Sequence, residues 1–309
     1  LPRAAEIAKR ISVIYLTLTV ACGVTYAALG MGPFDATVHA MTSISTGGFS
    51  TTDDSFGAFQ GPMEYAAAIF MILASLPFVR YVQMVAGTAK PFFADTQARA
   101  YLATILILTI FFAIYRLVVN GDQLEHGLRE AIFNVTSIIS GTGYASTDYQ
   151  TWGPVAVVVF FFVGLIGGCA GSTSCSIKVF RYQLLMTSIS TQLKRLYAPH
   201  GIFEPRYEGR KVSEEVLSSV MAFFVLFFVS LGVFSILLGL TGLDFITSVS
   251  GAASALANIG PGLGPIIGPA GTFEPLEDTA KWILAVAMLV GRLELMAVFV
   301  LFTARFWRG

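Results

Sequence analysis

The stretch that decides the fold is STGGFS at residues 45–50, because related versions occur twice more, as SGTGYAS at 140–146 and NIGPG at 258–262. Each copy follows a short, mostly uncharged segment of about four helical turns and lies between two long apolar segments. Aligned on their glycines, the copies recur at roughly 100-residue intervals, which indicates duplicated modules and not a solenoid of small repeats. Each module is predicted to consist of a long helix, a half-helix, a glycine turn and a second long helix.

The composition is that of a membrane protein. Apolar residues make up 55% of the chain, charged residues 12%, and the mean hydropathy is +0.73, whereas soluble domains carry about 25% charge. A formal net charge of zero argues against a nucleic-acid partner. Three cysteines give no disulfide framework, and the three histidines form no metal-binding constellation. Because no nucleophile turn accompanies the scattered Ser, His and Asp residues, an enzyme is disfavoured and no cofactor is expected.

Apolar runs near the ~20 residues that cross a bilayer predict five spans, at residues 11–29, 65–85, 101–119, 216–240 and 282–302. Half-helices too short to cross precede each glycine turn, and Asp35 and Asp244 are predicted to cap the first and third of them. A further apolar run, 155–166, breaks at a Gly/Ser-rich stretch, 167–176, and resumes as a basic amphipathic helix.

The charges predict the orientation of the chain in the membrane. Most Lys and Arg residues lie at the ends of the spans away from the glycine turns, and most Asp and Glu residues lie on the glycine-turn side. The positive-inside rule therefore predicts that the glycine turns face outward. The acidic outer rim could concentrate cations at the mouth of a pore, or its carboxylates could simply be solvated loop charges.

The glycine turns have the features that a cation filter requires. Each half-helix directs its negative C-terminal end at a turn, and non-helical backbone at membrane depth must line a cavity or be buried in protein. A single glycine turn is ordinarily loop chemistry, but three in one topological position favour a ring of ion-binding carbonyls. The predicted filter residues are Thr46, Gly47, Gly48, Gly141, Thr142, Gly143, Asn258, Ile259 and Gly260.

The motifs HAMTSISTGGFS, LPFVRYVQ, SGTGYAS, GGCAGST, NIGPGLG and GRLELMAVF together resemble the Trk/Ktr/HKT superfamily of potassium transporters, and within it the bacterial TrkH type. The resemblance extends over essentially the whole chain. It implies an all-α integral membrane protein of helix–pore-helix–helix modules, arranged as a K+-channel-like pseudo-tetramer. It also implies K+ uptake across the cytoplasmic (inner) membrane with K+ held at the filter residues, a homodimer in the lipid bilayer, and a cytoplasmic nucleotide-binding regulatory subunit of TrkA type.

The family has four modules, and three are predicted here, at residues 1–97, 98–208 and 209–309, resembling the second, third and fourth. The basic lead without a methionine resembles the start of a fragment, and three modules are not expected to close a four-sided filter alone. A non-conducting fragment therefore remains an alternative, as does a Na+-permeable or poorly selective relative. Glycine at all three filter positions favours K+, whereas a serine in the missing module would favour Na+ passage.

The stretch 167–176 is predicted to be a gating loop of unwound backbone beneath the filter, and its residues assigned to the gate are Gly167, Gly168, Gly171, Ser172 and Thr173. Arg292, in the middle of the last predicted span, is expected to hydrogen-bond carbonyls of this loop, because an arginine at that depth needs a partner. The alternative is that Arg292 pairs with a carboxylate on another helix. Basic residues expected to contact the regulatory subunit, or alternatively anionic lipid, are Lys194, Arg195, Arg206, Arg210 and Lys211.

Overall fold

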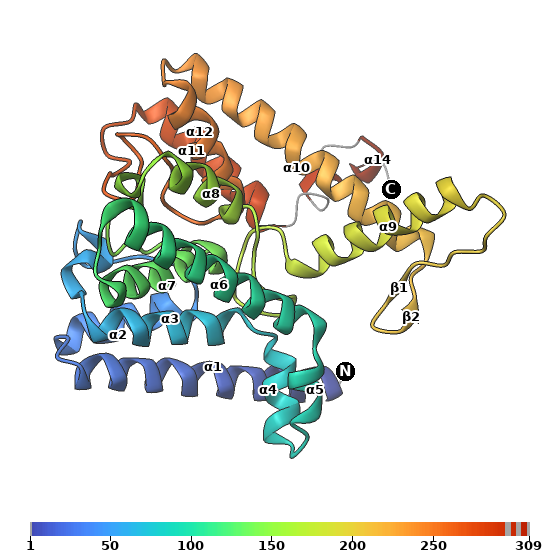
Figure 1. Ribbon diagram of the computed structural model, residues 1–309, viewed down its shortest axis with the longest axis horizontal. Helices are drawn as coiled ribbons and strands as arrows, with labels where there is room; N and C mark the ends of the chain where they lie inside the picture. Colours follow the sequence, from blue (N-terminus) through green and yellow to red (C-terminus); the bar gives the residue numbers. More distant parts are fainter. Residues whose placement is uncertain (1, 294–297, 301–303, 308–309) are drawn as a thin grey trace.

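The computed structural model describes residues 2–293, 298–300 and 304–307. Its helices form three groups that lie side by side, with the second group between the other two (Figure 1). The first group contains α1 (Pro2–Ala28), α2 (Pro33–Ile44), the 3-10 turn η1 (Ser55–Phe59), α3 (Pro62–Ser75) and α4 (Phe78–Val85).

The second group begins at a short connecting helix and ends in a long basic one. It contains α5 (Lys90–Ala94), α6 (Thr96–Tyr115), the π turn η2 (Arg116–Asn120), α7 (Leu124–Ser140), the 3-10 turn η3 (Tyr149–Trp152), α8 (Pro154–Gly164) and α9 (Val179–Tyr197). A small antiparallel hairpin follows, made of β1 (Arg206–Tyr207) and β2 (Arg210–Lys211). The third group contains α10 (Glu214–Leu240), α11 (Phe245–Ala257), α12 (Asp278–Arg292) and α14 (Ala304–Trp307).

Among the described residues, three helices are long and apolar enough to cross a membrane, Ala4–Ala28, Thr96–Asn120 and Glu214–Leu240, and the bent pair Pro62–Ser75 and Phe78–Val85 would make a fourth span. Little of their surface is buried inside the protein, 11%, 28% and 28% of the respective apolar windows. Apolar side chains that are not packed against protein need a lipid environment, so these helices present their outer faces to the bilayer. Of the two short apolar helices, α11 is mostly buried within the bundle, whereas α8 exposes Val155, Val158 and Phe162 on one face.

Local sequence signals account for most helix starts. Proline occupies the first position of α2, α3 and α8, where its missing N–H is not needed. Asp244 caps α11 by accepting hydrogen bonds from the backbone N–H groups of Ile246 and Thr247, as predicted. Asp35 does not cap α2, because Pro33 starts that helix earlier; its carboxylate instead accepts a hydrogen bond from Thr51 Oγ1 (2.7 Å).

Two predicted spans differ in the structure. The span at 65–85 is not one helix, because the chain bends by 90° between α3 and α4. Leu76, the residue before Pro77, is extended, as the proline ring requires, and no helix continues through that pair. The last span, predicted at 282–302, is helical in α12 up to Arg292 and again at 298–300, and residues 294–297 and 301–303 lie outside the described part of the chain.

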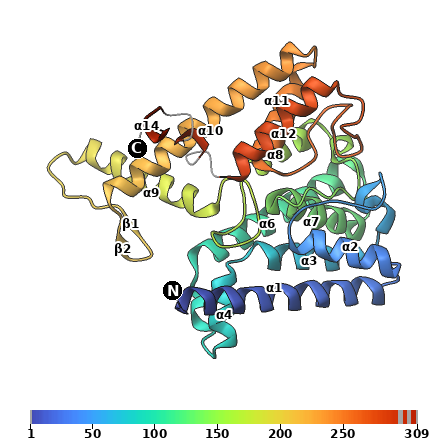
Figure 2. The ribbon, with the colours of Figure 1, turned by 180° about the vertical axis from the view of Figure 1, so that it is seen from behind.

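Both ribbon views place the N-terminus, α5, α9 and the β1–β2 hairpin at one end of the molecule (Figures 1 and 2). The turns that join α1 to α2 and α10 to α11 lie at the opposite end. The basic segments and the half-helix starts are thus separated along the long helices. This arrangement agrees with the two-sided topology that the charge distribution predicts.

Candidate ion filter and gating loop

The three glycine turns share one backbone conformation. In each turn the first and third residues have positive φ, a region that disfavours most side chains. The φ values are 51° at Thr46 and 66° at Gly48, 72° at Gly141 and 83° at Gly143, and 52° at Asn258 and 119° at Gly260. The predicted filter positions are therefore equivalent in geometry as well as in sequence.

Each turn is also tied to its own half-helix in the same way. The backbone N–H of the middle residue donates to a carbonyl five residues earlier: Gly47 to Thr42 (2.8 Å), Thr142 to Ser137 (3.0 Å) and Ile259 to Ser254 (3.0 Å). This is the bond that closes a helix C-terminus when a left-handed residue follows it. The half-helix thus fixes the path of the turn that leaves it.

Most carbonyl groups of the turns accept no hydrogen bond from the described residues. Gly260 O accepts a hydrogen bond from Ser254 Oγ (2.9 Å). Within residues 2–293, no donor bonds the carbonyl oxygen of any other predicted filter residue. Carbonyls removed from water without a partner are costly, and a ring of them is what coordinates a dehydrated cation.

The turns of neighbouring groups lie against one another. A Cβ added at Gly48 would overlap the carbonyl oxygen of Thr142, and one added at Gly143 would overlap that of Ile259. At Gly260 the nearest atom is Gly143 Cα, 3.9 Å away. The structure therefore brings the predicted filter residues together as three consecutive sides of a ring.

The ring is open between its first and third sides. Phe49, which follows the first turn and is 71% exposed, lines a cavity of about 300 Å³ together with Asn258 and Gly260 of the third turn. The rest of the cavity wall is mostly apolar and comes from α11 and α12. A fourth contributor to the ring would have to enter on this side.

One hydroxyl in each half-helix holds the segment that leaves the turn, and sequence reasoning missed it. Thr42 Oγ1 donates to Phe49 O (3.0 Å), Ser137 Oγ donates to Tyr144 O (2.7 Å), and Ser254 Oγ bonds both the N–H and the carbonyl of Gly260. The signal was available, because Thr or Ser stands at the same distance before the aligned glycine in all three copies.

The predicted gating loop, 167–176, lies within a longer non-helical segment. This segment, residues 165–178, joins the end of α8 at Gly164 to the start of α9 at Val179. Its position follows from its contacts: Cys175 N lies 3.4 Å from where a Cβ of Gly141 would be, and Ser176 N donates to Ala257 O (3.0 Å) at the end of α11. The loop therefore lies directly behind the C-terminal ends of two half-helices, next to the filter turns.

Other parts of the chain satisfy much of the loop's backbone. In the first group, Cys169 N donates to Ser75 O (3.0 Å), Thr173 N donates to Ala74 O (3.3 Å) and Phe78 N donates to Gly171 O (3.0 Å). The break between α3 and α4 supplies these partners, because the helix interrupted at Pro77 leaves carbonyl and N–H groups free. Gly167 and Gly168 lie buried in the loop, whereas Gly171 is exposed and Ser172 and Thr173 are half-buried.

Arg292 reaches the loop, although not through the expected carbonyl. Its Nη1 donates to Cys175 Sγ, whereas the carbonyl of Ser174 accepts from Lys178 Nζ. Lys178, which belongs to the same segment, already donates to the Ser174 carbonyl. Arg292, at the end of α12, donates to the thiol of the next residue, Cys175. Glu294, beside Arg292 in sequence, lies outside the described residues.

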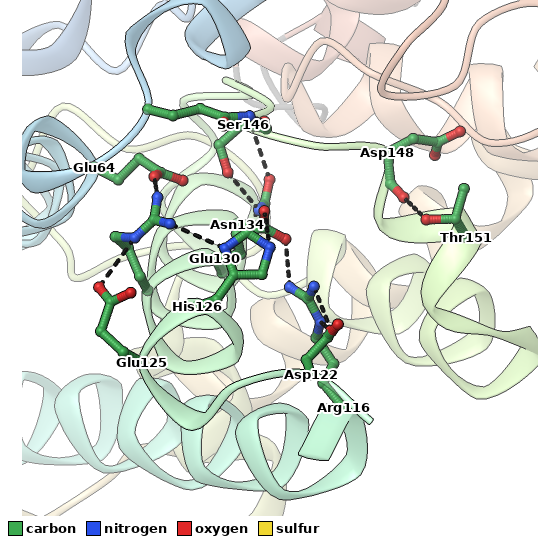
Figure 3. A network of polar contacts seen from close by, with 12 residues as sticks. Glu64, Arg116, Asp122, Glu125, His126, Glu130, Asn134, Ser146, Asp148 and Thr151 are labelled. Carbon is green, nitrogen blue, oxygen red and sulfur yellow. Dashed lines mark hydrogen bonds and ion pairs between the residues drawn. The ribbon is translucent and has the colours of Figure 1, made fainter. Parts of the chain in front are cut away.

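An ion-pair network anchors the start of α7 (Figure 3). Buried Arg116 pairs with Asp122 (2.6 Å) and with Glu130, and Arg129 pairs with Glu125 (3.1 Å) and with buried Glu64. All four carboxylates belong to the acidic outer rim expected from the sequence. Because the two arginines offset two of these four negative charges, the rim near the second group carries less net charge than its carboxylates alone would give.

The comparisons with known proteins show which family the chain resembles. A family model described as "TrkH: Cation transport protein" matches residues 1–308. The chain is 43% identical to the Trk system potassium uptake protein TrkI of Halomonas elongata, over 100% of this chain and 63% of that protein. It is 34% identical to the Trk system potassium uptake protein TrkH of Vibrio parahaemolyticus, over 100% of this chain and 64% of that protein.

The fold can be compared with a solved relative. The crystal structure of the potassium transporter TrkH from Vibrio parahaemolyticus superimposes with a TM-score of 0.93 at 32% identity, covering 99% of this chain and 66% of that one. The predicted all-α membrane fold is confirmed by this likeness. The chain spans somewhat less than two thirds of the length of each of these relatives.

Proposed function

The chain belongs to the TrkH family of cation transport proteins, and on that premise we propose that it forms part of a K+ uptake pathway across the cytoplasmic membrane. The observation that carries the proposal is the convergence of three equivalent glycine turns whose carbonyls, apart from that of Gly260, accept no hydrogen bond from the described residues. Such carbonyls can replace the hydration shell of a cation. K+ would be the transported ion, with no resident cofactor and no chemical reaction in this chain.

The proposed filter is formed by the three glycine turns, at residues 46–48, 141–143 and 258–260. The proposed gate is the loop 167–176 with Arg292, which lies behind the filter turns and contacts two half-helix ends. The three helix groups would correspond to three modules, 1–97, 98–208 and 209–309. The open side of the ring beside Phe49 is where a fourth module of the complete gene product would complete the filter.

Partners follow from the topology. With the glycine turns facing outward, α9 and the hairpin would lie in the cytoplasm, where Arg206, Arg210 and Lys211 present a basic surface. We propose that this surface meets a soluble nucleotide-binding regulatory subunit and that the transporter is a homodimer. Capture of the regulator by wild type but not by a charge-reversed hairpin would support the contact, and equal capture would favour anionic lipid as its partner.

The experiment that tests the function is cation uptake by cells that lack other K+ importers, expressing the complete gene product. Wild type should restore growth and K+ uptake at low external K+. Gly143→Ser should relax discrimination between K+ and Na+, because a side chain there meets the carbonyl of Ile259. Equal uptake of Na+ and K+ by wild type would instead indicate a poorly selective transporter, and an unchanged ratio in Gly143→Ser would remove that glycine from the filter.

A further inference from the structure

The second and third helix groups are joined by a two-bond contact that involves no filter residue. Gly264 N donates to Gln150 Oε1 (2.7 Å), and Gln150 Nε2 donates to Gly264 O (3.3 Å). Gln150 lies in η3, just beyond the second glycine turn, and Gly264 lies just beyond the third. We call this Gln150–Gly264 contact the clasp.

The Gln150 amide is held in one orientation. Asp148 Oδ1 accepts from both Gln150 N (3.0 Å) and Gln150 Nε2 (3.2 Å), so the amide nitrogen is fixed as the end that faces Gly264 O. Gly264 has a φ of 93°, and a Cβ at Gly268 would overlap Gln150 Nε2. The third-group loop at Gly264 and Gly268 therefore packs closely against the Gln150 side chain.

A related contact occurs one step around the ring. Gln60 Nε2 donates to Ser146 O (3.3 Å), and Phe56 N donates to Ala145 O (3.0 Å). Here a glutamine of the first group holds the segment that leaves the second turn. Each junction between neighbouring turns therefore has a glutamine bonded to the backbone across it.

We propose that Gln150 is a positioning residue for ion selectivity: the clasp sets the separation between the second and third turns, where Ile259 O lies against Gly143. The inference rests on the proposed function and deepens it. Discrimination between cations depends on how carbonyls are placed and how freely they move. Losing the clasp leaves both backbone groups of Gly264 without this partner and lets the two turns separate, while the carbonyls themselves remain.

The test measures K+ and Na+ fluxes into proteoliposomes that contain the complete gene product. Gln150→Ala should lower the K+/Na+ flux ratio severalfold while K+ flux persists. Gln150→Glu loses the donor to Gly264 O and sets a carboxylate oxygen against Asp148 Oδ1, so its ratio should fall at least as far as that of Gln150→Ala. Thr151→Ala is the matched control, because Thr151 lies in the same turn and its hydroxyl donates only to Asp148 O (2.7 Å); its ratio should equal that of wild type.

A folded Gln150→Ala protein with the wild-type ratio would overturn the role of the clasp in selectivity. Failure of both Gln150→Ala and Gln150→Glu to fold would also count against it, because the contact would then serve stability only. A wild-type protein that does not discriminate K+ from Na+ would overturn the proposed function and the clasp together. The ratio distinguishes these results, since a merely structural role would change the amount of active protein and leave the ratio constant.

Discussion

The glycine turns and the loop between α8 and α9 are neighbouring stretches of irregular backbone, yet they are held differently. Each turn bonds back to its own half-helix, as Thr142 N does to Ser137 O. The loop bonds partly to itself, as Gly167 N does to Ile177 O, and partly to other helix groups, through Ser75 O in the first and Ala257 O in the third. A segment held within its module moves with that module, whereas a segment held across modules responds when the modules shift.

The comparison teaches which element can serve as a filter and which as a gate. A filter must keep its carbonyls in place during conduction, and bonds to an adjacent rigid helix provide this. A gate must have two arrangements of similar free energy, and bonds between separate elements can be exchanged. The predictions below test this division, from the largest expected effect to the smallest.

The largest effect is expected from a side chain within the ring. Gly143→Ala should lower K+ uptake more than Gly260→Ala, because a Cβ at Gly143 overlaps Ile259 O and the nearest atom at Gly260 is 3.9 Å away. Overpacking costs about 1–3 kcal/mol, which would correspond to roughly 5- to 150-fold in rate. Both glycines have positive φ, so the pair controls for backbone strain. Equal losses in uptake would contradict the ring arrangement.

A smaller effect is expected from releasing the loop. Arg292→Ala, Lys178→Met and a shortened 171–174 segment should each raise K+ flux through reconstituted vesicles severalfold without changing the K+/Na+ ratio. The reason is that Arg292 and Lys178 hold Cys175 and Ser174 of the loop but contact no filter carbonyl. Lys9→Met is the control, since Lys9 is an exposed lysine of α1 in the first group. Wild-type flux in all three loop variants would show that the loop is not the barrier.

The smallest effect concerns the contribution of the α11 cap to the stability of the fold. Asp244→Ala should lower the free energy of unfolding by about 1 kcal/mol, since Asp244 caps α11. Asp35→Ala should cost less, because α2 has no side-chain cap. Thermal unfolding in detergent measures both changes. Equal losses of unfolding free energy in the two variants would mean that capping by Asp244 adds no stability beyond that of an uncapped aspartate.

The same cap predicts a pH dependence. Hydrogen bonding by Thr247 lowers the pKa of Asp244 below its ordinary value. The stabilisation is therefore complete above the pKa of an unfolded aspartate and is lost as pH falls through the lowered pKa of the folded state. Asp244→Ala should abolish this part of the acid dependence of unfolding.

The structural features that depend only on residues of the same module were predicted from the sequence. The three turns, the half-helices and the break before Ile177 all follow from local glycine, proline and apolar patterns. The bend at Pro77 was not predicted, because residues 65–85 were interpreted as one continuous span despite that proline. The partners of Arg292, the clasp and the Arg116–Glu130 pair could not be predicted, because each joins residues whose approach depends on how helices pack.

The most direct test of the central claim is to locate the ion. Crystals of the complete gene product grown in Rb+ should show anomalous scattering between the carbonyl oxygens of Thr142 and Ile259, and the signal should disappear when Na+ replaces Rb+. Gly143→Ser crystals provide the control, because a displaced Ile259 carbonyl should weaken the Rb+ signal. Rb+ bound elsewhere, with no signal at the three glycine turns, would contradict the assignment of these turns as the filter.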